Sequence, residues 1–196
     1  MKRLGLSLFP MLAITQILGI ALGHAAVQNV GDNSVYFTTY FSNANTPGAP
    51  DATVRIINDG DTNGNLWAAY YVFDDSQELS ECCSCLTTPD GVDSQSVNLQ
   101  LTSNPLTGRI LSRGIIKVIS SSTGDPTATT PTAGLRGWAT HIQKGIASTY
   151  RMTETEFADS NLSADEQWWL QILCHYEHLL GSGQGVCACT PEDSDF

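Results

Sequence analysis

Short runs of β-branched and aromatic residues recur along the chain between segments rich in Asn, Asp, Gly and Ser. The clearest run is Val35 to Phe41, in which apolar or aromatic residues fall on both faces of an extended segment. Such runs are typical of β-strands, and the polar segments between them are typical of turns. The pattern predicts six further strands, at residues 53–57, 66–73, 96–101, 114–120, 135–142 and 148–153. Seven short strands predict a mainly β fold, an antiparallel sandwich of the Greek-key, immunoglobulin-like type.

One long helical pattern follows these strands. Ser163 and Glu166 have the spacing of a capping box, and Gly181 can take the left-handed conformation that ends a helix, so a helix is predicted over residues 163–180. At 100° per residue, six apolar side chains share one broad face: Trp169, Ile172, Leu173, Tyr176, Leu179 and Leu180. This face is predicted to pack on the sandwich.

The first 25 residues differ from the rest of the chain. Lys2 and Arg3 precede an apolar run from residue 4 to residue 22, and small residues follow it up to Ala26. This pattern is typical of a secretory signal peptide that is cleaved after Ala25. The run is short for a membrane span and contains Pro10. We therefore expect an exported protein with a single mature domain over residues 26–196 and no membrane attachment after cleavage.

The charge of the chain limits the kinds of molecule that it is expected to bind. Nine basic residues stand against twenty acidic ones, a formal net charge of −11. Removal of a signal peptide with Lys2 and Arg3 would make the charge more negative still. Nucleic acid is therefore not expected as a partner, because phosphate binding needs a basic surface. An acidic surface of this kind attracts cations and keeps an exported protein soluble.

Six cysteines form two groups, Cys82, Cys83 and Cys85 in the first and Cys174, Cys187 and Cys189 in the second. In an exported protein such groups indicate disulfides. Close neighbours in sequence rarely bond each other, so each cysteine of the first group is predicted to bond one of the second, and six pairings remain possible. A bond between Cys174 and the tail is an alternative.

A metal site is the rival to these disulfides. In that interpretation Cys174, His178, Cys187 and Cys189 would supply thiolate and imidazole ligands to zinc or copper(I). Thiol–disulfide exchange is a further alternative for the same cysteines.

A second candidate metal site precedes the third predicted strand. Asp59, Asp61, Asn63 and Asn65 offer oxygen atoms at alternate positions, and Gly64 stands where a calcium loop turns sharply. Calcium is therefore a possible cofactor. The same residues also suit an ordinary polar turn.

Three other sets of residues carry weaker hypotheses. The acidic run of Asp74, Asp75, Glu78 and Glu81 is predicted to be a solvated loop in preference to a pair of glycosidase carboxylates. Trp67, Trp138 and Trp168 are predicted to be packing residues, with a sugar-binding platform as the alternative. His141 is predicted to be a packed, hydrogen-bonded histidine.

The first predicted strand is also a candidate for self-assembly. Val35, Phe37 and Phe41 would let it add to the sheet edge of a neighbouring molecule, and the alternative is an ordinary first strand of the sandwich.

Several segments together resemble a family of secreted bacterial proteins that has no assigned activity. They are 71–74, Cys82-Cys83-Ser84-Cys85 with Thr88-Pro89, 101–104, 138–143, and 180–189 with its terminal Cys-Ala-Cys. The resemblance implies secretion and the cysteine framework, and it implies no catalytic residue.

These observations favour a non-enzymatic, secreted module, structural, adhesive or self-assembling, that is stabilised by disulfides. Its partner would be a further copy of the chain or a cell-surface molecule. The alternatives are a protein that binds calcium or a transition metal, and a carbohydrate-binding or carbohydrate-active protein.

Overall fold

The computed structural model describes residues 34–189. The predicted signal peptide lies outside these residues, and so do the first residues of the predicted mature domain. Within the described range the chain forms nine strands, two short helical turns and one α-helix. The strands are β1 (Tyr36–Ser42), β2 (Thr53–Asn58), β3 (Leu66–Asp74), β4 (Leu79–Thr87), β5 (Val92–Ser96), β6 (Arg113–Ser121), β7 (Leu135–Lys144), β8 (Tyr150–Glu156) and β9 (Ala158–Asp159). The helical segments are η1 (Val97–Leu101), η2 (Ile146–Ser148) and α1 (Ala164–Leu179).

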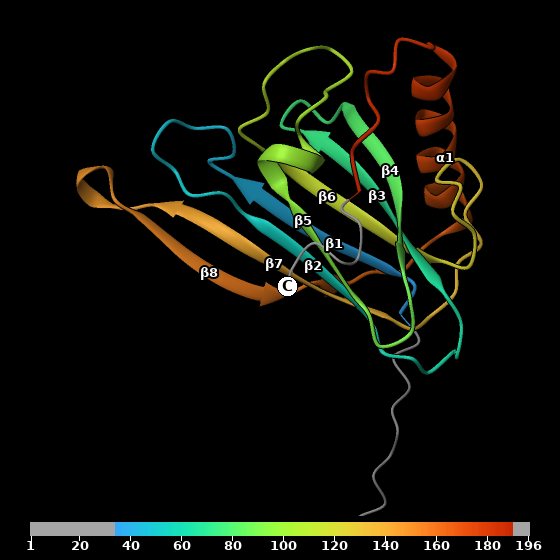
Figure 1. Cartoon of the computed structure of the whole chain (residues 1–196). Coiled ribbons are helices and arrows are strands. Elements are labelled where there is room, and N and C mark those ends of the chain that lie inside the picture. The colour runs from blue at the N-terminus through green and yellow to red at the C-terminus, as the bar shows by residue number, and fades with distance from the viewer. Residues whose placement is uncertain (1–33, 190–196) are drawn as a thin grey trace, which may run out of the picture. The chain divides into compact units, whose positions relative to one another are not determined.

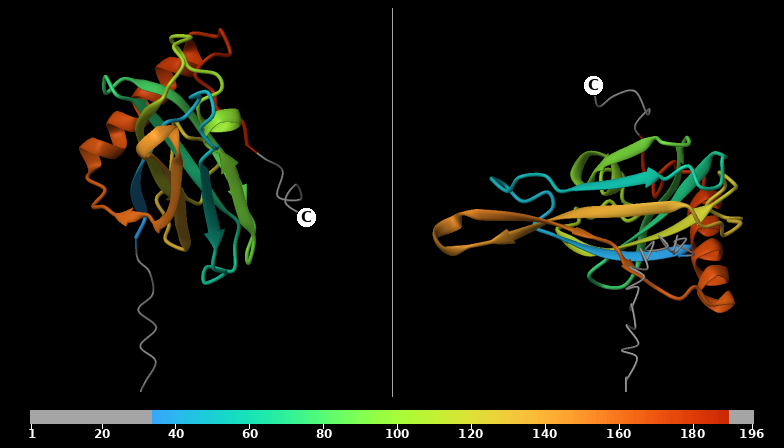
Figure 2. Two further views of the ribbon diagram at one scale, coloured as in Figure 1. Left: turned by 90° about the vertical axis from the view of Figure 1, so that its left-hand side faces the viewer. Right: turned by 90° about the horizontal axis from the view of Figure 1, so that it is seen from below.

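The strands form two antiparallel sheets, which confirms the predicted mainly β, sandwich-like class. The first sheet has the order β4-β3-β6-β1-β9, and the second has the order β5-β2-β7-β8. Figure 1 shows α1 beside the first sheet, near β3 and β4, and Figure 2 shows the β7–β8 hairpin extending beyond the other strands. In the described part of the chain, no helix has the length and apolar character that crossing a membrane requires.

Strand β3 explains the layered arrangement. Successive side chains of a strand point to opposite faces of its sheet. Tyr70 and Val72 therefore belong to the core between the two sheets, whereas Tyr71 and Phe73 belong to a second core beneath α1. Because both faces are covered, all but one residue of β3 are buried, and its sequence reads as a continuous apolar run.

The prediction of a β-strand at residues 96–101 is wrong, because most of this segment is helical. Val97–Leu101 forms a π-helical turn, because polar side chains satisfy the backbone N–H groups at its start. Ser96 Oγ accepts from Leu99 N at 2.8 Å, and Asp51 accepts from Asn98 N at 3.0 Å. Val97 and Leu101 are both buried, a spacing of four that suits a helical turn.

Helix α1 begins and ends as predicted. Ser163 Oγ accepts a hydrogen bond from Glu166 N at 3.1 Å, and Gly181 has a φ of 63°. The Glu166 carboxylate accepts from Lys117 Nζ at 2.6 Å and from the Tyr36 hydroxyl at 2.9 Å. The first turn of α1 is therefore attached to β1 and β6 of the first sheet.

The face of α1 that packs on the sheet differs from the prediction. Leu170, Cys174 and Glu177 are the buried residues of the helix. Trp169, Tyr176, Leu179 and Leu180, which were predicted to lie in the core, are exposed. The largest apolar face therefore points away from the sheet, because the bond at Cys174 and the packing of Leu170 set the rotation of the helix.

Two leucines of α1 test this rotation. Leu170 is 0% exposed and Leu179 is 64% exposed. Replacement of Leu170 by Ala should lower the free energy of unfolding by about 2 to 5 kcal/mol through lost burial and a cavity. Leu179→Ala should change it by less than about 0.5 kcal/mol. Chemical denaturation of both variants measures the difference, and equal losses would contradict the observed packing.

Candidate functional site

The first group of cysteines lies within strand β4, where the sequence predicted a loop. Cys82 belongs to the core beneath α1, and Cys83 and Cys85 belong to the core between the sheets. The sequence hides this strand because it is buried on both faces and therefore lacks an alternation of apolar and polar positions, and because Ser80, Glu81 and three cysteines interrupt the apolar run that made β3 recognisable. Half-buried strands are easier to recognise because they have that alternation.

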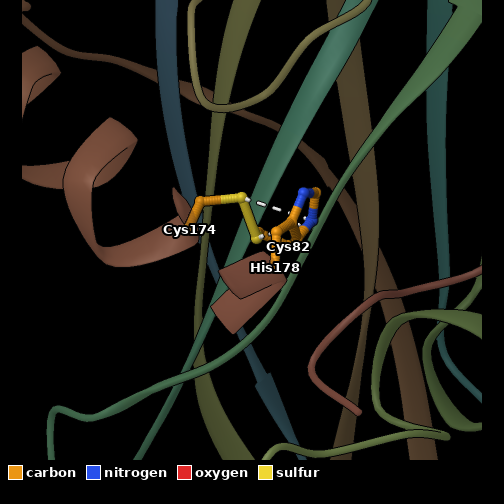
Figure 3. A group of neighbouring side chains, drawn as sticks. All are labelled: Cys82, Cys174 and His178. Carbon is orange, nitrogen blue, oxygen red and sulfur yellow. Dashed lines mark hydrogen bonds between the residues drawn. A yellow bond between two sulfur atoms is a disulfide. The ribbon is translucent and has the colours of Figure 1, made fainter. Parts of the chain in front are cut away.

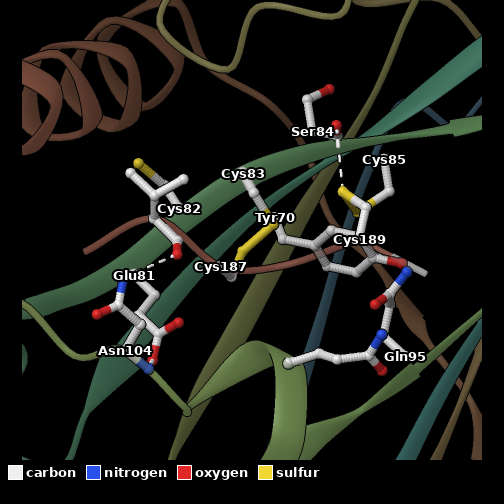
Figure 4. Close-up of a disulfide and its surroundings, with 12 residues drawn as sticks. Tyr70, Glu81, Cys82, Cys83, Ser84, Cys85, Gln95, Asn104, Cys187 and Cys189 are labelled. Atoms are coloured by element: carbon white, nitrogen blue, oxygen red, sulfur yellow. Dashed lines mark hydrogen bonds between the residues drawn. A yellow bond between two sulfur atoms is a disulfide. The ribbon is translucent and has the colours of Figure 1, made fainter. Parts of the chain in front are cut away.

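Three disulfides join β4 to the C-terminal part of the chain. They link Cys82 to Cys174, Cys83 to Cys187 and Cys85 to Cys189. The Cα separations are 5.9, 5.3 and 5.4 Å. Each bond joins one cysteine of the first group to one of the second, which is the predicted arrangement, and the structure selects one of the six pairings. Figure 4 shows the bonds of Cys83 and Cys85 to the tail.

The C-terminal tail covers the outer edge of β4, which is an edge strand of the first sheet. Cys82 N donates to Gly185 O at 2.7 Å, and Cys187 N donates to Cys82 O at 3.4 Å. Asn104 Nδ2 holds the tail from the other side through Gly183 O at 2.7 Å and Val186 O at 3.2 Å. Uncovered edges recruit strands of other chains, so the tail protects this part of the sheet.

Two glutamates are buried where β4, α1 and the tail meet. Glu81 is 0% and Glu177 is 3% exposed. Glu81 Oε1 accepts from Asn104 N at 2.9 Å, whereas Glu81 Oε2 and Glu177 Oε1 have no hydrogen-bond partner among residues 34–189. Gly185 lies against the Glu177 side chain, and a Cβ there would stand 2.9 Å from Glu177 Oε2. A larger residue at 185 would therefore collide with Glu177.

Burial changes the ionisation of both carboxyl groups. Loss of water raises the pKa of Glu81 to about 7, although the N–H of Asn104 acts in the opposite direction. Loss of water, together with the nearby negative charge of Glu81, raises the pKa of Glu177 to about 8. Both groups thus take up protons at a higher pH than an ordinary glutamate does, and they form a pair of buried acids beside the tail.

The burial of this pair was not predicted from the sequence, because Glu81 belongs to an acidic run that is typical of a solvated loop. Glu81, Cys83 and Cys85 are two residues apart in one strand, and that spacing would have placed Glu81 among buried side chains if the strand had been recognised. Asp74, from the same acidic run, is also buried, and its Oδ1 accepts from Ser76 N and Glu78 N.

The sulfur atoms of the predicted transition-metal site are occupied by covalent bonds. Cys82 Sγ and Cys174 Sγ are bonded to each other, and His178 Nε2 lies 3.8 Å from each (Figure 3). The sulfur of Cys189 lies instead within 4.8 Å of the sulfur atoms of Cys83 and Cys85. Cys174 and His178 are therefore separated from Cys189, and the predicted set of Cys174, His178, Cys187 and Cys189 is not assembled as one centre.

The predicted calcium loop is the turn between β2 and β3. Asp59 Oδ1 accepts from Asp61 N at 3.1 Å, and Asp59 Oδ2 lies 3.7 Å from Arg136 Nε. Asn63 has a φ of 51°, a conformation that asparagine tolerates in turns. The residues thus have the roles of an ordinary polar turn, and calcium binding by Asp59, Asp61, Asn63 and Asn65 stays a prediction.

Strand β1 does not present the predicted assembly surface. Phe37 and Phe41 are buried in the core between the sheets, and Val35 packs against the core beneath α1. The strand pairs with β6 along its length and with β9 at Phe37 and Thr38. Val35, Phe37 and Phe41 are thus used by the fold itself, as in an ordinary strand of the sandwich.

His141 is packed as predicted. Its Nδ1 lies 3.1 Å from Tyr40 O, its Nε2 lies 2.7 Å from Thr155 Oγ1, and its ring stacks on Tyr40 with 4.1 Å between centroids. Burial lowers the pKa of His141.

The three tryptophans of the sugar-binding alternative come from three layers. Trp67 lies in the first sheet, Trp138 in the second sheet and Trp168 on α1. They do not build one continuous platform.

An apolar groove lies between α1 and the start of β4, with a volume of about 340 Å³. We call it the α1 groove. Its lining residues are Gln77, Glu78, Leu79, Leu106, Trp169, Leu173, Tyr176, Glu177 and Leu180. A concave, mainly apolar surface with a few polar groups is the usual form of a ligand site. The groove joins the exposed face of α1 to the buried acids.

The buried acids predict how stability depends on pH. A pKa that is raised in the folded state stabilises the fold fully below the unfolded value and loses this effect as pH rises through the folded value. The free energy of unfolding should therefore fall between about pH 5 and pH 8, by at most about 1.4 kcal/mol per pH unit for each retained proton. The lowered pKa of His141 acts in the opposite sense.

Glu177→Gln isolates the contribution of the carboxyl group. The amide keeps the size of the side chain and cannot ionise, so the variant should lose less stability than the parent between these pH values. Urea denaturation at several pH values measures both proteins. Parallel pH profiles would show that Glu177 is not a buried acid.

No family model and no curated protein matches this chain. One similar solved structure is described as "Crystal Structure of Thermotoga maritima 1070". It covers 68% of this chain and 99% of its own, with 12% identity and a TM-score of 0.43. A likeness of this size carries no argument about fold or function.

Proposed function

We propose that the chain is a non-enzymatic, adhesive module of the extracellular space, which binds a basic protein partner through the exposed face of α1. The three disulfides fit an oxidising environment, and the apolar start of the sequence supports export. The observation that carries the proposal is the orientation of α1, whose largest apolar side chains point to solvent.

The exposed face of α1 has the composition of a binding surface. Its exposed apolar residues are Trp168, Trp169, Tyr176, Leu179 and Leu180. Contiguous exposed apolar side chains are uncommon on a protein that acts alone, and Trp and Tyr contribute most to protein–protein binding. The bond between Cys82 and Cys174 holds this surface in a fixed orientation, so little ordering is needed when a partner binds.

The charge of the chain selects the kind of partner. The net charge is −11, and α1 contains no Lys or Arg. Two copies of the chain would repel each other through their net negative charge, whereas a basic partner would be attracted. We therefore favour a basic polypeptide over a second copy.

A synthetic peptide of alternating leucine and lysine tests this proposal, with a leucine–glutamate peptide as the charge control. The parent should bind only the lysine peptide. The double variant Trp169→Ala/Tyr176→Ala should bind it at least about tenfold more weakly, because aromatic contacts in an interface are each worth about 1 kcal/mol or more. Fluorescence anisotropy at physiological salt measures the affinities.

The matched control is Ile146→Ala/Met152→Ala, which removes two exposed apolar side chains near and on β8. It should bind as the parent does. Both double variants keep the net charge, so equal binding by all three proteins would leave only general electrostatic attraction and overturn the proposal. A parent dimer that Trp169→Ala/Tyr176→Ala abolishes would show instead that the occupant is a second copy.

A further inference from the structure

We propose that the α1 groove is a binding site for a cationic side chain, the lysine or arginine of a basic peptide, whose methylene chain lies on the apolar lining while its charge reaches Glu177 and Glu78. This inference rests on the proposed function and deepens it. The cation of the basic partner would lie in the α1 groove, with Glu177 and Glu78 as its acidic partners.

The apolar part of the groove suits the stem of such a side chain. Leu79 and Leu106 contribute from the sheet side, and Trp169, Leu173 and Tyr176 contribute from α1. Lysine and arginine have three or four methylene groups, which commonly lie along apolar surfaces while the charged end meets a polar group. Aromatic rings such as those of Trp169 and Tyr176 also attract cations.

The polar part of the groove contains a carboxyl oxygen whose hydrogen-bonding capacity is not used by the described residues. Glu177 lines the groove, is 97% buried, and has an oxygen, Oε1, that finds no hydrogen-bond partner in the described part of the chain. A buried, unpaired carboxyl oxygen is costly in a folded protein, because it has lost its water and gained no bond in exchange. Oε1 is shielded from solvent, so a donor that enters the groove would supply the missing bond once the side chains that cover this oxygen move aside.

The charges around Glu177 favour a cation as that donor. Glu78 lies at the exposed rim of the groove, and no Lys, Arg or His lines it. Glu81 is close enough to interact electrostatically with Glu177. The groove also lies against the last turns of α1, where the helix dipole presents partial negative charge. At about pH 8.5, above the pKa values of Glu177 and Glu81, an anion would meet repulsion from Glu177, Glu78, Glu81 and the end of the helix.

Three small probes of equal length separate the contributions: n-hexylammonium, 1-hexanol and hexanoate. Titration at about pH 8.5 keeps the amine protonated. Hexylammonium should bind and should shift the NMR signal of the Trp169 indole N–H. Hexanol should bind at least about fivefold more weakly, because it lacks the charge-assisted bond. Hexanoate should not bind. Equal binding of hexylammonium and hexanol would reduce the site to an apolar groove and overturn the proposal.

Variants of the acidic residues locate the charge. Glu177→Gln should weaken hexylammonium binding about tenfold or more, and Glu78→Gln, at the exposed rim, should weaken it about two- to threefold. Glu156→Gln, on the exposed strand β8, is the matched control and should have no effect. Should Glu177→Gln fail to fold, the probe series and Glu78→Gln still decide the outcome.

Failure of this inference differs from failure of the proposed function. A lysine peptide that binds through Trp169 and Tyr176 while hexylammonium leaves the groove signals unchanged would refute the groove and retain the adhesive face. Loss of both kinds of binding would refute both.

Discussion

The disulfide between Cys82 and Cys174 is the interaction on which the rest of the structure depends. An amphipathic helix normally lies with its most apolar face on the core. In α1 the bond to Cys82 requires Cys174 to face the sheet. Leu170 and Glu177 lie on the same side of the helix. As a result, Trp169, Tyr176 and Leu180 point outward or border the α1 groove. The fold thus stabilises a surface that packing alone would have buried.

The other two disulfides act mainly on geometry. In the chain-entropy model, the first bond across about 90 to 100 residues contributes about 4 to 5 kcal/mol, and further bonds between the same two segments close only small loops. The bonds at Cys187 and Cys189 instead keep the tail on the edge of β4. The tail in turn contacts Glu177 through Gly185, so the sulfur framework also maintains the buried acids whose pKa values are raised.

The sequence contained enough information for the fold class, most strands, the ends of α1 and the three-to-three arrangement of the disulfides. Each of these depends on local chemistry: β-branched residues, the Ser163 cap, Gly181 and the spacing of the cysteines. Strand β4 was not predicted because both of its faces are covered and its buried residues include Ser80, Glu81 and three cysteines, so it shows neither a period of two nor the apolar run of β3.

The rotation of α1, and with it the candidate site, was predicted wrongly because apolar content was given more weight than the bond at Cys174. Had that bond been used to orient the helix, Glu177 would have been placed in the interior three residues further on. The burial of Glu81 and the shape of the groove depend on contacts between segments far apart in the sequence, such as Asn104 with the tail, and these have no local signal.

The most direct test of the account is disulfide mapping of the non-reduced protein by proteolysis and mass spectrometry. Because the cysteines of each cluster stay together on one proteolytic peptide, partial reduction with stepwise alkylation is used to assign the individual bonds. The account predicts the pairs Cys82 with Cys174, Cys83 with Cys187 and Cys85 with Cys189. A bond from Cys174 to Cys187 or Cys189, or a free thiol at Cys174, would release α1 from β4 and contradict the orientation on which the proposed binding surface depends.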